Sequence, residues 1–378
     1  MKGRRRFNGS LLHVTYWLET NSFVVPCSLV VKLCLCLLPL AFLDAGCQAK
    51  SEQPRPHHQA VSRRAILPSE PSEPDGDAAS AAPPTAMPSD SLGFVGSETS
   101  LGTLVSQLRR TANEPRDFRP LGGSSITFRV ELEPSALAAF KPATRDRPTA
   151  YQREIAAFRL AEALGLPNIP PAIIARYARE SIQTHLHSDY RNVWNELNDR
   201  ILWDAHGYTV GALIHWVSDV KPVRLSELGT PSWTQWLLQG IAAPSMSVAR
   251  DLSNMLVFDY LIGNWDRFSG GNFKMTQDSL RLIYLDHNSA FGAPLRDKVH
   301  RRIYQKLKQA QKFSKSLVER LATLDENQLD AMFEVRDASL RLLSELQVKG
   351  LMERRATILS YVQSLIEIHG DEKVLIFD

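Results

Sequence analysis

Cysteine is scarce in this chain of 378 residues and is confined to its amino-terminal end. The four cysteines are Cys27, Cys34, Cys36 and Cys47, and none follows them. The rest of the chain can therefore hold neither a disulfide framework nor a metal site built from thiolates. Exported proteins in an oxidising compartment often avoid unpaired thiols, so this distribution is compatible with export.

The chain also lacks an excess of charge of either sign. Its 44 lysines and arginines face 41 acidic residues, which leaves a formal net charge of +3. Such a balance does not by itself indicate a nucleic-acid partner or an anionic membrane surface, and we expect no nucleic-acid partner. With 44% hydrophobic and 22% charged residues, the composition is typical of a globular protein. It excludes a collagen, a coiled coil, a polytopic membrane protein and a wholly disordered chain.

The apolar run Leu33–Leu43 is too short to span a bilayer, which takes roughly 20 apolar residues. Its length fits the hydrophobic part of a secretory signal, although a buried core segment is the alternative. Ala45-Gly46-Cys47 resembles the end of a bacterial lipobox, while Asp44 departs from the small or apolar residues usual there. We expect residues 1–47 to direct export, with Cys47 a candidate lipidated membrane tether; without a working signal, the protein would be cytoplasmic.

Residues 48–118 are poor in large apolar residues and rich in proline, serine, alanine and glutamate. Nine prolines lie between Pro54 and Pro115. Such a segment buries too little apolar surface to offset the entropy lost on ordering, so we expect a disordered linker. The one ordered element considered within it is a short helix at Leu101–Ser106 that packs on the following domain.

Residues 119–220 have the pattern of a small α+β lobe. Alternating and β-branched stretches predict strands, with a hairpin turn at Glu133-Pro134-Ser135, and a stretch of good helix formers ends at Gly165. The expected strands are Ser125–Glu131, Leu137–Lys141, Ala172–Tyr177 and Tyr208–Val217, and the expected helix is Tyr151–Leu164.

Residues 221–378 are mainly helical in pattern. The apolar helix Val248–Ile262 is followed by Gly263, a favourable residue at a helix end, and by the polar loop Asn264–Asn272. Two short strands, Phe273–Thr276 and Leu282–Leu285, then form a hairpin, and helices are expected from Val299 onward.

A lysine at the end of a strand and a glutamate in the next helix form the first candidate pair. Lys141 ends the second expected strand, and Glu154 lies 13 residues later in the helix. Kinases use such a pair to hold the nucleotide phosphates, because the carboxylate fixes a flexible ammonium group. Taken alone, a lysine and a glutamate are more often ordinary surface residues.

Two aspartates form the second candidate pair. Asp266 lies in the loop after the apolar helix, and Asp286 follows the apolar strand 20 residues later. Phosphoryl transfer needs one carboxylate to orient the acceptor hydroxyl and another to hold a divalent metal. Aspartates that cap helices or stabilise turns are the alternative. The ordered set of lysine, glutamate and two aspartates on matching elements favours a kinase-like architecture.

At this point the resemblance to a known family becomes specific. Phe258–Arg267 (FDYLIGNWDR) and Leu282–Gly292 (LIYLDHNSAFG) resemble the catalytic half of the four-jointed and related secretory-pathway atypical kinases. More distantly, the chain is similar to HipA-type and phosphoinositide kinases. The similarity extends upstream through Ala138–Pro142 and Tyr151–Pro171. It implies a two-lobed protein-kinase-like fold with a small β-rich N-lobe and a mainly helical C-lobe.

The resemblance also implies roles for individual residues. Lys141 would contact the phosphates of ATP, and Glu154 would position it. Asp266 would be the catalytic aspartate, with Arg267 supporting its loop. Asp286 would hold Mg²⁺ or Mn²⁺.

Two parts of the expected site depart from the protein-kinase pattern. Asn272, the candidate second metal ligand, is six residues after Asp266 instead of five. A full glycine-rich motif is lacking, but Gly122, Gly123 and Ser124 precede the first strand and could cover phosphates through backbone N–H groups.

The sequence therefore predicts a phosphotransferase that moves the γ-phosphoryl group of a nucleotide to a hydroxyl acceptor on a protein, glycan or lipid. Protein serine or threonine is the acceptor suggested by the four-jointed likeness. Two rivals remain: an exported pseudokinase that binds a partner without turnover, and a surface lipoprotein that is not an enzyme.

Overall fold

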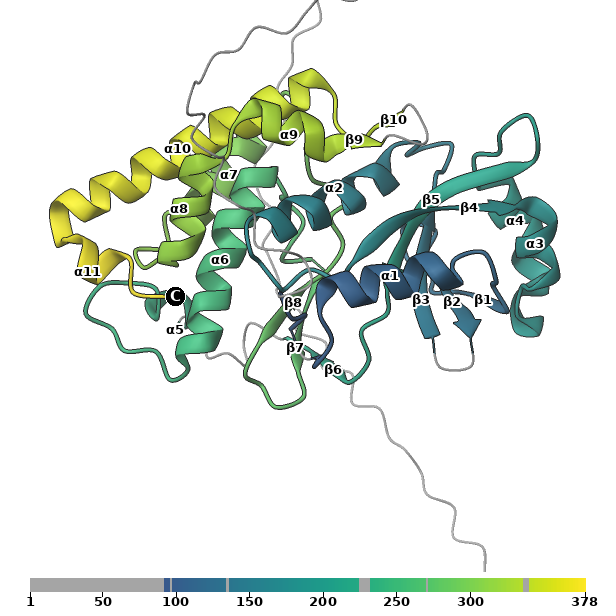
Figure 1. The fold of residues 1–378 in the computed structure, drawn as a ribbon, viewed down its shortest axis with the longest axis horizontal. Coiled ribbons are helices and arrows are strands. Elements are labelled where there is room, and N and C mark those ends of the chain that lie inside the picture. The colour runs from purple at the N-terminus through teal and green to yellow at the C-terminus, as the bar shows by residue number, and fades with distance from the viewer. Residues whose placement is uncertain (1–91, 96, 134–135, 224–231, 270, 336–339) are drawn as a thin grey trace, which may run out of the picture. The chain divides into compact units, whose positions relative to one another are not determined.

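The computed structural model describes residues 92–378, apart from residues 96, 134–135, 224–231, 270 and 336–339 (Figure 1). The chain divides into two units, Met1–Asp77 and Ala78–Asp378, and every described residue belongs to the second. The expected export signal and most of the expected linker lie outside the described residues.

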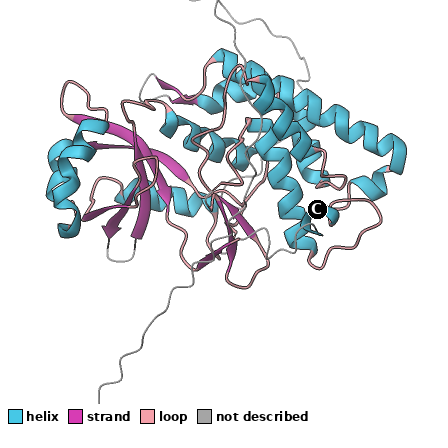
Figure 2. Ribbon diagram, turned by 180° about the vertical axis from the view of Figure 1, so that it is seen from behind, coloured by secondary structure: helices cyan, strands magenta, loops and turns pink. Residues whose placement is uncertain are grey.

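A five-stranded antiparallel sheet forms the N-lobe, with the strand order β1-β2-β3-β5-β4 (Figure 2). The strands are β1 (Asp117–Pro120), β2 (Phe128–Glu133), β3 (Ala136–Pro142), β4 (Ala172–Ala178) and β5 (Tyr208–His215). The expected hairpin is β2–β3, and its strands pair with Phe128 opposite Phe140.

The two faces of this sheet contribute to different cores. Phe128, Phe140 and Tyr177 belong to a cluster that is covered at the outer end of the sheet by short helices. The opposite face contacts α2, whose buried residues join the core of the C-lobe. The helices of the N-lobe are α1 (Leu101–Thr111), α2 (Ala150–Ala163), α3 (Arg179–Thr184), the 3₁₀ helix η1 (Ser188–Val193) and α4 (Trp194–Arg200).

The expected linker extends too far toward the carboxyl end, because residues 92–118 contain both α1 and the start of β1. The side chain of Ser100 caps α1 by accepting a hydrogen bond from the Thr103 amide. Leu101, Leu104 and Leu108 then fall on one buried face. The average composition of a long proline-rich segment concealed this apolar stripe, which has the spacing of an amphipathic helix. The short helix that the sequence suggests at Leu101–Ser106 forms the first part of α1.

The C-lobe combines a three-stranded sheet, in the order β6-β7-β8, with packed helices. The strands are β6 (Val220–Pro222), β7 (Phe273–Thr276) and β8 (Leu282–Tyr284), and a separate hairpin comprises β9 (Glu334–Val335) and β10 (Leu340–Arg341). The helices are α5 (Ser232–Gln235), α6 (Met246–Ile262), α7 (Asp297–Leu307), α8 (Lys315–Thr323), α9 (Glu326–Phe333), α10 (Glu345–His369) and α11 (Asp371–Val374).

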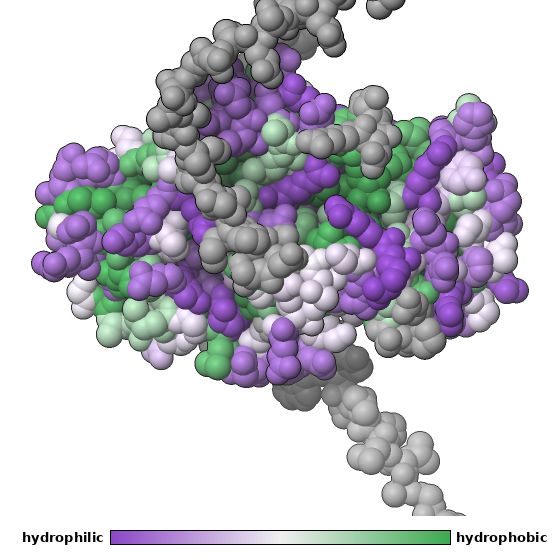
Figure 3. All heavy atoms as spheres, in the orientation of Figure 1, coloured by the Kyte–Doolittle hydropathy of each residue, from purple (hydrophilic) through white to green (hydrophobic). Residues whose placement is uncertain are grey.

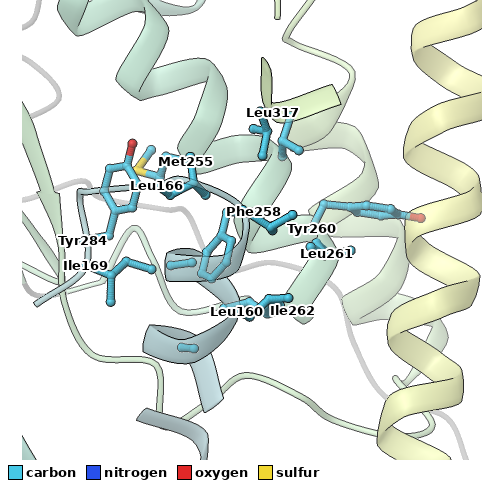
Figure 4. Close-up of a cluster of buried hydrophobic side chains, with 14 of the residues drawn as sticks. Leu160, Leu166, Ile169, Met255, Phe258, Tyr260, Leu261, Ile262, Tyr284 and Leu317 are labelled. Carbon is cyan, nitrogen blue, oxygen red and sulfur yellow. The ribbon is translucent and has the colours of Figure 1, made fainter. Parts of the chain in front are cut away.

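Helix α6 lies at the centre of the C-lobe core. Ser245 caps its start, and Gly263 ends it in the left-handed conformation with φ of 68°, as the sequence predicts. Figure 4 shows Phe258 of α6 among Leu160 of α2 and Ile169, so the same core extends between the lobes. This packing fixes α2 relative to the loop that follows α6.

Hydrophilic residues are interspersed with smaller apolar areas on the face in Figure 3. Among the described residues, no helix combines the length and apolarity that crossing a bilayer requires.

Helix α1 should contribute to the stability of the fold. We expect Leu104→Ala to lower the free energy of unfolding by about 2–5 kcal/mol, because it removes a buried side chain and leaves a cavity. Arg110→Ala, on the exposed face of the same helix, should change it by less than about 0.5 kcal/mol. Urea unfolding measures both, and equal effects would show that α1 is not part of the core.

Candidate functional site

The side chain of Lys141 lies between two carboxylates that come from distant parts of the chain. Alternation along β3 places Phe140 in the core of the sheet and Lys141 on the opposite face, toward α2. Its Nζ is 2.5 Å from Oε1 of Glu154 and 2.9 Å from Oδ1 of Asp286. The structure thus brings together three of the expected site residues, and Lys141 links them.

Glu154 connects this lysine to the loop after β8. Its Oε2 accepts hydrogen bonds from the backbone N–H of His287 at 3.0 Å and from Nδ1 of the same residue at 3.3 Å. Glu154 is only 3% exposed, and the ring of His287 packs edge-on against Phe258. His287 is therefore a positioning residue that holds the carboxylate of Glu154.

Burial and ion pairing oppose each other at this junction. Burial lowers the pKa of Lys141, but the attraction of Glu154 and Asp286 outweighs it, so the pKa lies above its ordinary value. Burial raises the pKa of Glu154, but attraction to Lys141 and the hydrogen bond from His287 hold it well below the usual range. Burial lowers the pKa of His287. Lys141 and Glu154 are therefore both charged, and His287 is neutral at neutral pH.

Asp286 reaches the cleft because the backbone turns sharply after β8. Its φ is 57°, in the left-handed region, and its side chain is 33% exposed. One carboxylate oxygen accepts the hydrogen bond from Lys141. The carboxylate is thus oriented by Lys141 while remaining open to the cavity.

Asp266 lies in the loop after α6 and is held by short-range hydrogen bonds. Its backbone N–H donates to Oδ1 of Asn264 at 3.2 Å, and its carboxylate accepts from the hydroxyl of Ser269. Asn264 is anchored in turn to Asp259 of α6. The carboxylate of Asp266 lines the same cavity as that of Asp286.

Arg267 is 1% exposed and does not face the cleft. Its Nε and Nη2 donate to the carboxylate of Asp259, with distances of 2.9 Å, while Nη1 donates to the carbonyls of Asn272 and Leu285. One buried guanidinium therefore joins the loop of Asp266 to the strand that precedes Asp286. Its geometry fits the expected support of the loop and not a contact with substrate.

Asn272 has one side-chain atom engaged and one available. Its Nδ2 donates to the carbonyl of Asp266 at 2.9 Å, which leaves the amide oxygen for a ligand. The oxygens of Asp286 and Asn272 suit Mg²⁺ or Mn²⁺, which prefer oxygen donors. In the described part of the chain, no group of three or more histidine, cysteine, aspartate or glutamate residues could hold a metal ion. Other ligands would have to come from a bound phosphate or water.

Two cavities meet at Asp286 and Asn272. The first, of about 590 Å³, contains Lys141 and is lined on its apolar side by Ile169, Ile214 and Trp216. Ile214 lies in β5, and Trp216 follows directly after this strand.

The second cavity, of about 680 Å³, contains Asp266, Trp265 and the turn at Gly122, Gly123 and Ser124. Both glycines have positive φ, 73° and 95°, which explains why glycine suits this turn. The turn also borders the first cavity through Gly122. The expected phosphate-covering residues therefore lie where the two cavities join.

Sequence reasoning missed three residues at this site: Asp259, Arg147 and Arg153. Asp259 carried a weak signal, because it is the one polar residue in the apolar stretch Met255–Ile262, eight residues before Arg267. The two arginines carried no local signal, since their place in the second cavity depends on tertiary packing.

Comparison with known proteins finds a family model and two relatives that resemble part of this chain. Residues 242–374 match the family model described as "Golgi casein kinase, C-terminal, Fam20". The matched range includes Asp266 and Asp286 but not Lys141 or Glu154. The mouse (Mus musculus) and human (Homo sapiens) proteins named "Pseudokinase FAM20A" are 32% identical over 127 and 128 residues. These matches cover 32% of this chain and 23% of each relative.

Solved structures with the same fold extend the comparison to both lobes. The Golgi casein kinase with Mn/ADP bound has a TM-score of 0.56 at 17% identity, covering 72% of this chain and 79% of that one. The structure of hydra Fam20 with sugar has a TM-score of 0.56 at 18% identity, covering 76% and 96%. At these identities the likeness establishes the fold alone. The predicted two-lobed kinase-like fold is confirmed, whereas the narrower four-jointed resemblance stays a prediction.

The charge of Glu154 should make stability depend on pH. Because its pKa is depressed in the folded protein, its contribution is complete above its ordinary value of 4.5 and is lost as the pH falls below that. We expect Glu154→Gln to cost about 3 kcal/mol at pH 7. The gap should narrow by about 1 kcal/mol at pH 3.5, measured by urea unfolding. Exposed Glu196→Gln is the control, and a gap that widens in acid would contradict this prediction.

The pair of Arg267 and Asp259 should be strongly coupled. Arg267→Met or Asp259→Leu alone should destabilise the fold by about 3–5 kcal/mol, because each leaves a buried charge without its partner. The double variant should cost clearly less than the sum of the two. Urea unfolding of all four proteins measures this coupling, and additive losses would disprove it.

Proposed function

We propose that this protein is an ATP-dependent phosphotransferase that uses Mg²⁺ or Mn²⁺ and moves a γ-phosphoryl group to a hydroxyl acceptor. The observation that carries the proposal is the junction at Lys141. Its ammonium lies within 2.9 Å of both Glu154 and Asp286, which are 13 and 145 residues away in sequence. This is the lysine, helix glutamate and metal-binding aspartate arrangement that kinases require.

The nucleotide would occupy the first cavity. The apolar side formed by Ile169, Ile214 and Trp216 suits adenine, and Lys141 lies where the cavity turns polar. The phosphates would pass Lys141 beneath the backbone N–H groups of Gly122 and Gly123. The Mn/ADP named with the Golgi casein kinase structure supports this choice of ligands.

The acceptor hydroxyl would enter the second cavity beside Asp266. Its oxygen attacks the γ-phosphorus, the bond from that phosphorus to the β–γ bridging oxygen breaks, and ADP leaves with the electron pair. Asp266 orients the hydroxyl and accepts its proton. Asp286 and Asn272 would hold the divalent metal, which when bound neutralises phosphate charge.

The proposal specifies the chemical class of the acceptor, an alcohol, and leaves the molecule that carries it open. A serine or threonine hydroxyl of a protein fits the four-jointed likeness and the name of the Golgi casein kinase. A glycan hydroxyl fits the sugar named with hydra Fam20. Both are alcohols, so the same residues would act on either. We place the protein in the secretory pathway or beyond it, on the Golgi kinase likeness and the expected signal in residues 1–47.

A second candidate function is a pseudokinase that binds nucleotide or a partner without turnover. The name of the mouse and human relatives favours it. The assembled set of Lys141, Glu154, Asp266 and Asp286 favours turnover instead. Asp266 is the residue that separates the two, because a carboxylate that accepts the proton of a hydroxyl is needed for transfer and not for nucleotide binding.

Two variants separate catalysis from binding. We expect Asp266→Asn to keep Mn²⁺-ADP affinity within about twofold while lowering phosphoryl transfer about 100- to 10,000-fold, because only the proton acceptor is lost. Asp286→Asn should lose both transfer and metal-dependent nucleotide affinity.

Calorimetry with Mn²⁺-ADP and turnover of ATP by the chain from residue 92 measure the two properties, with exposed Asp297→Asn as the control. Nucleotide binding without turnover in the unaltered protein would establish the pseudokinase. Absence of both would refute the proposed function.

A further inference from the structure

Two arginines in the second cavity have no part in the mechanism above. Arg147 lies in the loop between β3 and α2, and Arg153 lies on α2, one residue before Glu154. Both line the cavity that contains Asp266, Asn272 and Asp286. The helix that presents Glu154 to Lys141 therefore also presents a cation to the acceptor half of the cleft.

A hydrogen-bond network holds these arginines at the cavity wall. Arg147 Nη1 donates to the hydroxyl of Ser125 at 3.0 Å, and Asn288 Nδ2 donates to the same hydroxyl at 3.1 Å. Arg153 Nη1 donates to the carbonyl of Asn288 at 2.9 Å. The network joins the glycine turn to the loop after Asp286, so both guanidinium groups are oriented before any ligand binds.

The positive charges of the two arginines are poorly neutralised. The carboxylate nearest Arg147 is that of its neighbour Asp146, at 3.7 Å, and both side chains are well exposed. Within the described residues, Arg153 forms no ion pair, and its Nε is buried without a hydrogen-bond partner. Burial and the nearby charge of Arg147 lower the pKa of Arg153. By contrast, Lys141 is shared by two carboxylates.

The position of Arg147 and Arg153 determines which part of a bound nucleotide would lie beside them. The nucleotide cavity and the second cavity share Asp286 and Asn272, so a triphosphate that extends past them brings its terminal group toward Arg147 and Arg153. During transfer, charge is spread over the three equatorial oxygens of that group. Planar guanidinium donors match such oxygens in both charge and geometry.

We propose that Arg147 and Arg153 form a cationic subsite that binds the γ-phosphoryl group during its transfer. This inference rests on the proposed function and deepens it. The subsite would distinguish ATP from ADP, and it would stabilise charge on the transferred group beyond what the single, already paired Lys141 can provide. The two arginines are catalytic residues in the sense that they contact the reacting group.

The test compares two ligands that differ in the terminal phosphoryl group. Dissociation constants are measured by calorimetry for ADP and for a non-hydrolysable imido analogue of ATP, each with Mg²⁺. We expect R147Q/R153Q to bind the analogue at least about 100-fold more weakly, because one charge-assisted hydrogen bond per arginine is lost, and to bind ADP within about twofold of the unaltered protein. Arg110→Gln, on the exposed face of α1, removes one cation away from the cavity and should change neither constant.

Three results would overturn the subsite: an equal loss for both nucleotides, no loss for either, or a matching loss in Arg110→Gln. If the unaltered protein binds Mg²⁺-ADP, any of these removes the subsite and leaves the nucleotide site intact. If it binds neither nucleotide, the proposed function fails and the subsite fails with it.

A conservative variant guards against a folding defect. R147K/R153K keeps both charges but loses the planar donors, so it should recover most of the affinity for the analogue and weaken it only about threefold. If the glutamine variant unfolds, this smaller loss, confined to the analogue, supports the subsite. A lysine variant that weakens both nucleotides alike would assign the arginines to the structure of the loop instead.

Discussion

The arrangement of this protein depends on one largely buried cation held between two carboxylates. Lys141 comes from the sheet of the N-lobe, Glu154 from the helix behind it and Asp286 from the C-lobe. Removing such charges from water is costly, and the cost is offset only when all three groups meet with good geometry. The junction therefore specifies how α2 and the loop after β8 lie against β3, and it orients Asp286 toward the cleft at the same time.

A second, buried ion pair, between Arg267 and Asp259, holds the loops of Asp266 and Asp286 in place, as the Lys141 junction holds the two lobes together. Arg267 binds Asp259 within the C-lobe core and also donates to two backbone carbonyls, one next to each candidate catalytic loop. The two ionic groups are linked through two consecutive residues just after β8, because the carbonyl of Leu285 accepts from Arg267 and the carboxylate of Asp286 accepts from Lys141. Both loops are held in place because the buried guanidinium of Arg267 needs hydrogen-bond acceptors, which the loop carbonyls provide. The loop sequences themselves do not determine this placement.

The chemical character of the lining changes from one end of the two joined cavities to the other. The apolar end suits a base, the shared middle holds carboxylate and amide oxygens, and the far end carries arginines and Asp266. A phosphoryl group moving along the joined cavities would leave the region of Lys141, whose charge is already balanced, for one with unbalanced positive charge. In the proposed function, an electrostatic gradient of this kind would stabilise the group during its transfer.

Local sequence patterns were enough to predict the β2–β3 hairpin, the helix carrying Glu154, and the apolar helix and strand that precede Asp266 and Asp286. Periodicity and turn residues encode these within a few positions, and their order was enough to select candidate residues. The prediction of a disordered linker was wrong for residues 92–118, because their average composition concealed the apolar stripe of α1. Contacts between distant residues depend on the folded arrangement: Arg267 is buried against Asp259, the Asn272 amide donates to the Asp266 carbonyl, and Arg147 and Arg153 line one cavity. The spacing of these residues along the chain gives no periodic signal that they are partners. Their pairing depends on how the whole fold packs and on the cost of burying a charge without a partner.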